Sequence, residues 1–142
     1  MAKGNDFKKI KSKSSSRFKI KDVPTPKTNH DFSKPIFSFR YMQYGGTNCI
    51  TRCERDVRLS IVDTIIRISQ LTWREMSSAP REGLGHEKVP QWRFRISLQL
   101  PVGITQEVPA VVFRYSESGR IAGFRKEDIF HIIAVGSNLY TH

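Results

Sequence analysis

The residue types that could do chemistry gather in the last third of the chain. Arg114, Arg120 and Arg125 stand near the ends or turns of expected strands, where guanidinium groups could bracket a phosphate. Tyr140 could stack a base or assist a reaction, and His142 could move a proton near neutral pH. Guanidinium, aromatic and imidazole groups together are typical of a site that binds phosphate and stacks bases, so an RNA-acting protein is the first hypothesis.

Each of these residues also has a structural interpretation, which the sequence leaves open. His131 could share the proton-transfer role, but it interrupts an apolar strand and would then be a hydrogen-bonded, half-buried histidine. Tyr140 would anchor the C-terminus, and Arg114 would cap a face of the sheet.

A second candidate cluster lies in the segment Arg81–Pro90, whose two glycines and proline predict a loop. Arg81, His86 and Lys88 could contact RNA there, as Arg114 could in the C-terminal region. Glu87 could act as a base only if burial or its neighbours raise its pKa.

Motifs for other chemistries are missing from the sequence. It has no phosphate-binding loop, no dinucleotide glycine pattern, no HExxH and no elbow around a nucleophilic serine. Cys49 and Cys53 form one pair without the four ligands of a structural zinc site, so we interpret them as reduced packing thiols, with metal or redox work as the alternative. We expect no metal and no cofactor.

Charge divides the chain into two parts. Residues 1–30 hold nine Lys/Arg against two Asp, which is most of the net charge of +11. This stretch has too few large apolar groups to offset the entropy of ordering, so we predict a basic disordered tail and a single domain over residues 31–142. A basic arm attracts phosphate backbones or acidic partners, although it would also serve as a solubilising leader.

No stretch of the sequence approaches the ~20 apolar residues that span a bilayer, and the basic start is not followed by the apolar core of a signal peptide. We therefore expect a cytoplasmic protein that has no membrane partner.

The elements that would position these residues follow from hydrophobic periodicity. Alternation predicts strands at Ile36–Met42 and Gln91–Leu100, and helical spacing predicts a mostly buried helix from about Cys53 to Met76. A meander follows, with turns at Ser118-Gly119 and around Lys126–Asp128 and with Ile129–Val135 as the central strand. The fold class is α+β, with one long helix packed on a four- or five-stranded, mainly antiparallel sheet.

The stretch RIAGFRKEDIFHIIAVGSNLYTH, within residues 110–142, carries a resemblance. An Arg-bearing strand, an apolar strand and a terminal Tyr or His, after a strand and a long helix, resemble the RelE/ParE superfamily of small bacterial toxins. The chain is longer by its basic stretch, and it has one clear helix where the family has a helical hairpin. Together with RIAGFR and DIFHII, the stretch WREMSSAPREGLGHEK also resembles a group of uncharacterised bacterial proteins of similar length.

The RelE/ParE resemblance implies a ribosome-linked, metal-independent endoribonuclease, in which a ribose 2′-OH attacks the adjacent phosphate of mRNA. Arg120 or Arg125 would then clamp the phosphate, and Tyr140 or His142 would take the terminal aromatic or proton-transfer place. RNA or the ribosome would be the partner, with an antitoxin or another protein as a further one. The alternative is a non-catalytic module that binds nucleic acid or protein through its basic arm.

Overall fold

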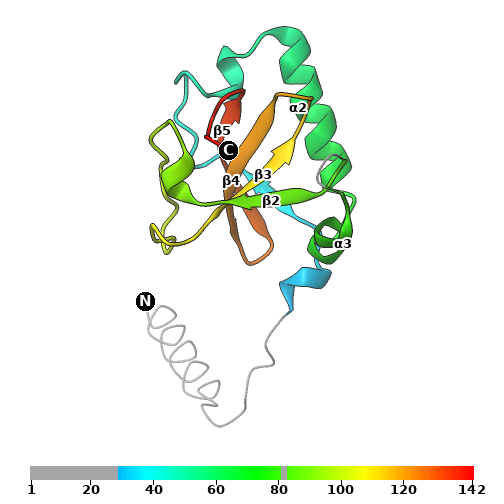
Figure 1. The fold of residues 1–142 in the computed structure, drawn as a ribbon. Helices are drawn as coiled ribbons and strands as arrows, with labels where there is room; N and C mark the ends of the chain where they lie inside the picture. The colour runs from blue at the N-terminus through cyan, green and yellow to red at the C-terminus, as the bar shows by residue number, and fades with distance from the viewer. Residues whose placement is uncertain (1–28, 81–82) are drawn as a thin grey trace, which may run out of the picture.

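The computed structural model describes residues 29–80 and 83–142 (Figure 1). The predicted tail lies outside these residues except for Asn29 and His30, and so does Arg81. The strands and helices in chain order are β1 (Ile36–Ser38), α2 (Arg55–Ile68), α3 (Trp73–Ser78), β2 (His86–Val89), β3 (Ala110–Arg114), β4 (Arg120–Lys126) and β5 (Ile129–Gly136).

The sheet has five strands in the order β1-β5-β4-β3-β2. β2, β3, β4 and β5 pair antiparallel, whereas β1 pairs parallel with β5, Ile36 lying beside Ile129. The α+β class is confirmed, but the sheet is mixed rather than mainly antiparallel. No hairpin turn joins β1 to β5, so nothing local imposes an antiparallel pairing. The central strand is β4, not the segment Ile129–Val135 as predicted.

The predicted long helix is two helices, because the chain turns between Ile68 and Trp73. Thr72 caps the second helix: its hydroxyl accepts from the Glu75 amide at 3.1 Å, and the Glu75 carboxylate accepts from the Thr72 amide at 3.0 Å. This reciprocal capping box starts a new helix and directs the buried Trp73 toward the sheet.

The first helix, α2, is less buried than its apolar pattern predicted. Ile61 and Ile68 are fully buried, whereas Leu59, Val62 and Ile66 are exposed. The sheet covers only one stripe of the helix, so the wide apolar arc continues onto the surface.

The two faces of the sheet carry separate parts of the core. The helices α2 and α3 lie beside the sheet (Figure 1). On one face they pack over aromatic and aliphatic side chains of the strands, namely Val111, Phe113, Ile121, Phe130, Ile132 and Val135. The segment after β2 covers the other face, with Phe94, Ile96, Leu98 and Leu100 half-buried against it.

That covering segment is not the strand predicted for Gln91–Leu100. It starts with a 3-10 turn, Gln91–Arg93, and Trp92 is 78% exposed instead of buried. Its backbone bonds go to the C-terminal residues: the Arg95 amide donates to the Leu139 carbonyl at 2.8 Å, and the Thr141 amide donates to the Arg93 carbonyl at 2.9 Å. The alternation of apolar side chains therefore reflects a segment that is buried on one side. It does not reflect a regular ladder of backbone hydrogen bonds with a neighbouring strand.

The predicted loop Arg81–Pro90 contains edge strand β2. Successive side chains of a strand point to opposite faces, so His86 and Lys88 lie on the helix side and Glu87 lies on the other. Within the described residues no helix is long and apolar enough to cross a membrane.

Candidate functional site

Three of the four predicted catalytic residues surround one pocket at the C-terminus. This C-terminal pocket, of about 380 Å³, is lined by Glu117, Ser118, Arg120, Asn138, Leu139, Tyr140 and His142. Arg120 opens β4 directly after the turn from β3. Tyr140 and His142 follow β5, where Asn138 adopts a left-handed conformation with φ of 58°. This conformation, which asparagine tolerates better than most residues, brings the last residues back to the sheet.

Tyr140 is a buried residue of this pocket, held by the edge strand. Its hydroxyl donates a 2.6 Å hydrogen bond to Glu87 Oε1, and its side chain is 6% exposed. Burial raises the pKa of Tyr140, and the bond to Glu87 raises it further, while nearby Arg120 acts in the opposite direction. Tyr140 therefore stays neutral and positions its neighbours, and it offers no open face on which a base could stack.

Arg120 is also buried, at 8% exposure, and the β3–β4 turn fixes its guanidinium. Nη1 donates to the carbonyl oxygens of Ser116, Glu117 and Gly119 at 3.3, 3.0 and 3.0 Å. These contacts hold a positive charge at the wall of the pocket in a set orientation.

Arg114 lies directly across from Arg120 in the register of β3 and β4. Like charges opposite each other in a sheet are unfavourable. Arg114 Nε is buried and has no hydrogen-bond partner among the described residues. The register places the predicted RNA contact Arg114 beside the predicted clamp Arg120, but Arg114 lines a different pocket, with Thr64, Arg67 and Tyr115, and not the C-terminal pocket.

Of the three predicted catalytic residues at the C-terminal pocket, His142 is the exposed one. Its ring lies 5.3 Å from the Tyr140 ring at an interplanar angle of 61°. An imidazole held against a fixed aromatic ring and open to solvent can exchange a proton with a bound substrate.

Arg125 is separated from the other three predicted catalytic residues. Arg120 and Arg125 are an odd number of positions apart on β4, so their side chains lie on opposite faces of the sheet. Arg125 lies 4.4 Å from the centre of the Trp73 ring, its Nη2 contacts Asp31 Oδ1 at 2.8 Å, and its Nε donates to the Glu127 carbonyl at 2.7 Å. The structure thus gives it contacts on the helix side.

His86 and Lys88, predicted to contact RNA, lie on the helix side with Arg125. Arg81 falls outside the described residues. His131 is half-buried against Tyr41, with ring centres 5.2 Å apart, and burial lowers its pKa. It lies toward the opposite end of β5 from Gly136, so the structure does not bring it to the C-terminal pocket.

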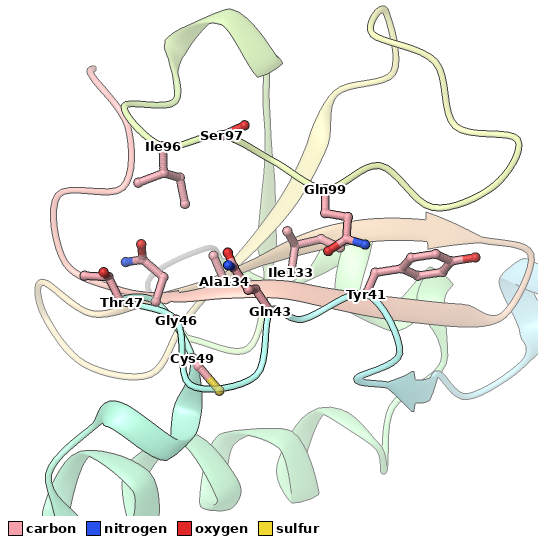
Figure 2. Close-up of a pocket in the computed structure, with 11 residues that line it drawn as sticks. Tyr41, Gln43, Gly46, Thr47, Cys49, Ile96, Ser97, Gln99, Ile133 and Ala134 are labelled. Carbon is pink, nitrogen blue, oxygen red and sulfur yellow. The ribbon is translucent and has the colours of Figure 1, made fainter.

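A smaller pocket of about 210 Å³, shown in Figure 2, has a polar lining without charged side chains. Gln43, Thr47, Ser97 and Gln99 contribute to it, above the buried Cys49. Burial alone would raise the pKa of Cys49, but hydrogen bonds from Thr51 and from the nearby backbone lower it overall. None of the lining residues carries a positive charge, so this pocket has no side chain that would pair with a phosphate.

The described part of the chain contains no group of three or more His, Cys, Asp or Glu side chains that could hold a metal ion. The thiols of Cys49 and Cys53 instead make local contacts: Cys49 Sγ lies 3.0 Å from the Thr51 hydroxyl, and Cys53 Sγ lies 3.7 Å from the Cys49 carbonyl oxygen.

The sequence predicts Glu87 only as a conditional base in a loop and gives no sign of its contact with Tyr140. Recognising His86–Val89 as a strand would have placed Glu87 on the opposite face of the sheet from His86 and Lys88. The contact of Glu87 with Tyr140 is long-range and has no local signal in the sequence. The chain matches no family model, and no curated protein or solved structure is significantly similar to it.

Proposed function

We propose that the chain acts on single-stranded RNA at the C-terminal pocket and cleaves it by attack of the ribose 2′-OH. The observation that carries this proposal is the meeting of Arg120, Tyr140 and His142 around one pocket, with Glu87 holding Tyr140 in place. Arg120 supplies positive charge, His142 supplies a proton acceptor, and Tyr140 supplies the fixed ring against which His142 rests. Such a reaction uses a positive charge near the phosphate and a positioned proton acceptor.

In the proposed reaction, neutral His142 accepts the proton of the 2′-OH. The 2′ oxygen forms a bond to the adjacent phosphorus, and the bond from phosphorus to the 5′ oxygen breaks. The departing oxygen takes a proton from water, and the hydroxide left behind takes the proton from His142. The products end in a 2′,3′-cyclic phosphate and a 5′-hydroxyl. Arg120 stabilises the charge that builds on the phosphate oxygens.

The net charge of +11 supports a polyanionic substrate, because basic groups draw nucleic acid by releasing its counterions. The resemblance to RelE/ParE toxins points to the same chemistry. It adds three proposals: mRNA on the ribosome as the substrate, an antitoxin-like protein as a regulator, and the cytoplasm as the compartment.

Inducible expression in a bacterium tests this function, with growth and transcript integrity followed together. The proposal predicts slowed growth and shortened transcripts for the wild type and for His30→Ala, which changes a histidine outside the pocket. His142→Ala should leave both growth and transcripts unaffected. Intact transcripts at full expression of the wild type would contradict the proposal.

A second candidate function is a non-catalytic RNA-binding module. The buried, carbonyl-bound guanidinium of Arg120 and the buried Tyr140 favour it, because such groups suit a structural role. The cations Lys88 and Arg125 on the other face also favour it, since a binding module spreads its contacts. In this case the wild type and His142→Ala would bind RNA, and neither would cut it.

A further inference from the structure

A second pocket lies on the helix side of the sheet, beside edge strand β2. This β2 pocket has a volume of about 500 Å³ and is lined by Ser77, His86, Lys88, Val108, Pro109, Val111 and Arg125. Its lining residues come from α3, β2, β3, β4 and the segment before β3. The C-terminal pocket shares none of them.

Positive charge dominates the β2 pocket. Lys88 and Arg125 contribute cations, and none of the described lining residues is a carboxylate. Lys88 is exposed, so its ammonium group can reach a ligand. Asp31 offsets part of the charge of Arg125, and the contacts of Nε and Nη2 hold that guanidinium in one orientation.

Lys88 and Arg125 both lie close to His86, and the charge of each affects the same imidazole. Burial lowers the pKa of this histidine, and the charges of Lys88 and of Arg125 lower it further. The imidazole is stacked on Phe113, with ring centres 5.5 Å apart and planes 15° apart, and its Nδ1 is buried without a partner among the described residues. His86 is therefore a neutral part of the pocket wall, close to both cations.

Val108, Pro109 and Val111 form an apolar part of the wall, and Ser77, whose hydroxyl donates to the Trp73 carbonyl, completes the lining. A pocket with cations on one side and an apolar wall on the other suits a ligand with an anionic group and an organic body. Lysine and arginine together are suited to phosphate, because one supplies a point charge and the other a planar set of donors.

We infer that the β2 pocket binds a phosphate group attached to an organic body, with Lys88 and Arg125 holding the phosphate and Val108, Pro109 and Val111 contacting the body. Because this site shares no lining residue with the C-terminal pocket, it stands whether or not the proposed cleavage occurs. The phosphate could belong to a mononucleotide or to an RNA strand, and the experiment separates these sources.

Trp73 reports on this site, since its ring contacts both Arg125 and His86. The sequence has two tryptophans, and Trp92 is 78% exposed, so Trp92→Phe leaves Trp73 as the single tryptophan, which is excited selectively at the red edge of the absorption band. This variant is titrated with inorganic phosphate, with adenosine monophosphate and with a short single-stranded RNA. Amide NMR shifts of His86 and Lys88 are followed in parallel, so that binding without a fluorescence change is still detected.

We expect saturable binding that moves the His86 and Lys88 signals, with the nucleotide bound more tightly than inorganic phosphate because of the apolar wall. Lys88→Gln should weaken binding about tenfold or more. Arg52→Gln, which removes an exposed cation from another part of the surface, should leave it unchanged.

Tighter binding of adenosine monophosphate than of the RNA would identify a small phosphorylated ligand. Tighter binding of the RNA, with the same loss in Lys88→Gln, would identify the pocket as part of an RNA surface. The inference is overturned if none of the three probes shifts the His86 and Lys88 signals, or if Lys88→Gln and Arg52→Gln weaken binding equally.

Discussion

The Tyr140 hydroxyl donates a 2.6 Å hydrogen bond to Glu87 Oε1, joining two residues that are 53 positions apart. This contact ties the C-terminal segment to edge strand β2. The position of His142 depends on it, because the imidazole rests against the Tyr140 ring.

Tyr140→Phe should lower the free energy of unfolding by about 1–2 kcal/mol, because it removes the part-buried hydrogen bond from the Tyr140 hydroxyl to a carboxylate oxygen. Urea denaturation measures this loss. Tyr44→Phe is the matched control, since Tyr44 is 87% exposed and should tolerate the change. Equal stability of the two variants would show that the bond between Tyr140 and Glu87 contributes nothing.

The faces of α2 give a second prediction. Ile61→Asp places a charge where the side chain is 0% exposed, so it should cost about 3 kcal/mol or more and can prevent folding. Val62→Asp, at the next position but 48% exposed, should cost about 1 kcal/mol or less. Thermal unfolding followed by circular dichroism compares the two variants, and similar melting temperatures would refute the assigned faces.

The close approach of β4 to β5 gives a third prediction. A Cβ added at Gly123 would lie 2.1 Å from the His131 carbonyl oxygen, at the position where the register of the two strands shifts. Gly123→Ala should therefore cost about 2 kcal/mol or more, since backbone must move. At Gly83 the nearest atom would lie at 3.5 Å, so Gly83→Ala should be tolerated. Differential scanning calorimetry of both variants decides between these outcomes.

The lowered pKa of His86 predicts how stability depends on pH. Its usual value is 6.5, and burial with Lys88 and Arg125 nearby lowers it in the folded chain. As the pH falls below about 6.5, the unfolded chain takes up the proton first, so stability decreases until the pH reaches the folded pKa. Above that range His86 has no effect on the pH dependence.

His86→Phe should therefore reduce the loss of unfolding free energy between about pH 7.5 and about pH 5, which urea denaturation at the two pH values measures. His131 also has a lowered pKa, so part of the loss should remain. An unchanged loss in His86→Phe would show that this histidine titrates alike in the folded and unfolded chain.

Local patterns predicted much of the fold. The turns at Ser118-Gly119 and around Lys126–Asp128 are confirmed between β3, β4 and β5, because turn residues and apolar runs act over short distances. The parallel pairing of β1 with β5 depends on contacts across most of the chain, which no local pattern encodes. The break between α2 and α3 had a local signal, since Thr72 and Glu75 have the spacing of a capping box.

The candidate site was predictable in part for the same reason. Residue type alone pointed to Arg120, Tyr140 and His142, which the structure brings together. Side chains alternate between the two faces of a strand, so the spacing of Arg120 and Arg125 on β4 would have placed them on opposite faces of the sheet. By contrast, the contact between Glu87 and Tyr140 arises only when the C-terminus returns to the edge strand.

The most direct test of the proposed cleavage uses purified protein and a short single-stranded RNA, free and bound to ribosomes, with the same RNA carrying 2′-O-methyl groups as the matched control. The wild type should cut the first RNA to give a 2′,3′-cyclic phosphate and a 5′-hydroxyl, and it should leave the methylated RNA intact. His142→Ala should bind the RNA and leave it uncut. RNA that stays intact both free and on ribosomes, with the wild type at near-stoichiometric concentration, or equal cutting by His142→Ala, would contradict the proposal.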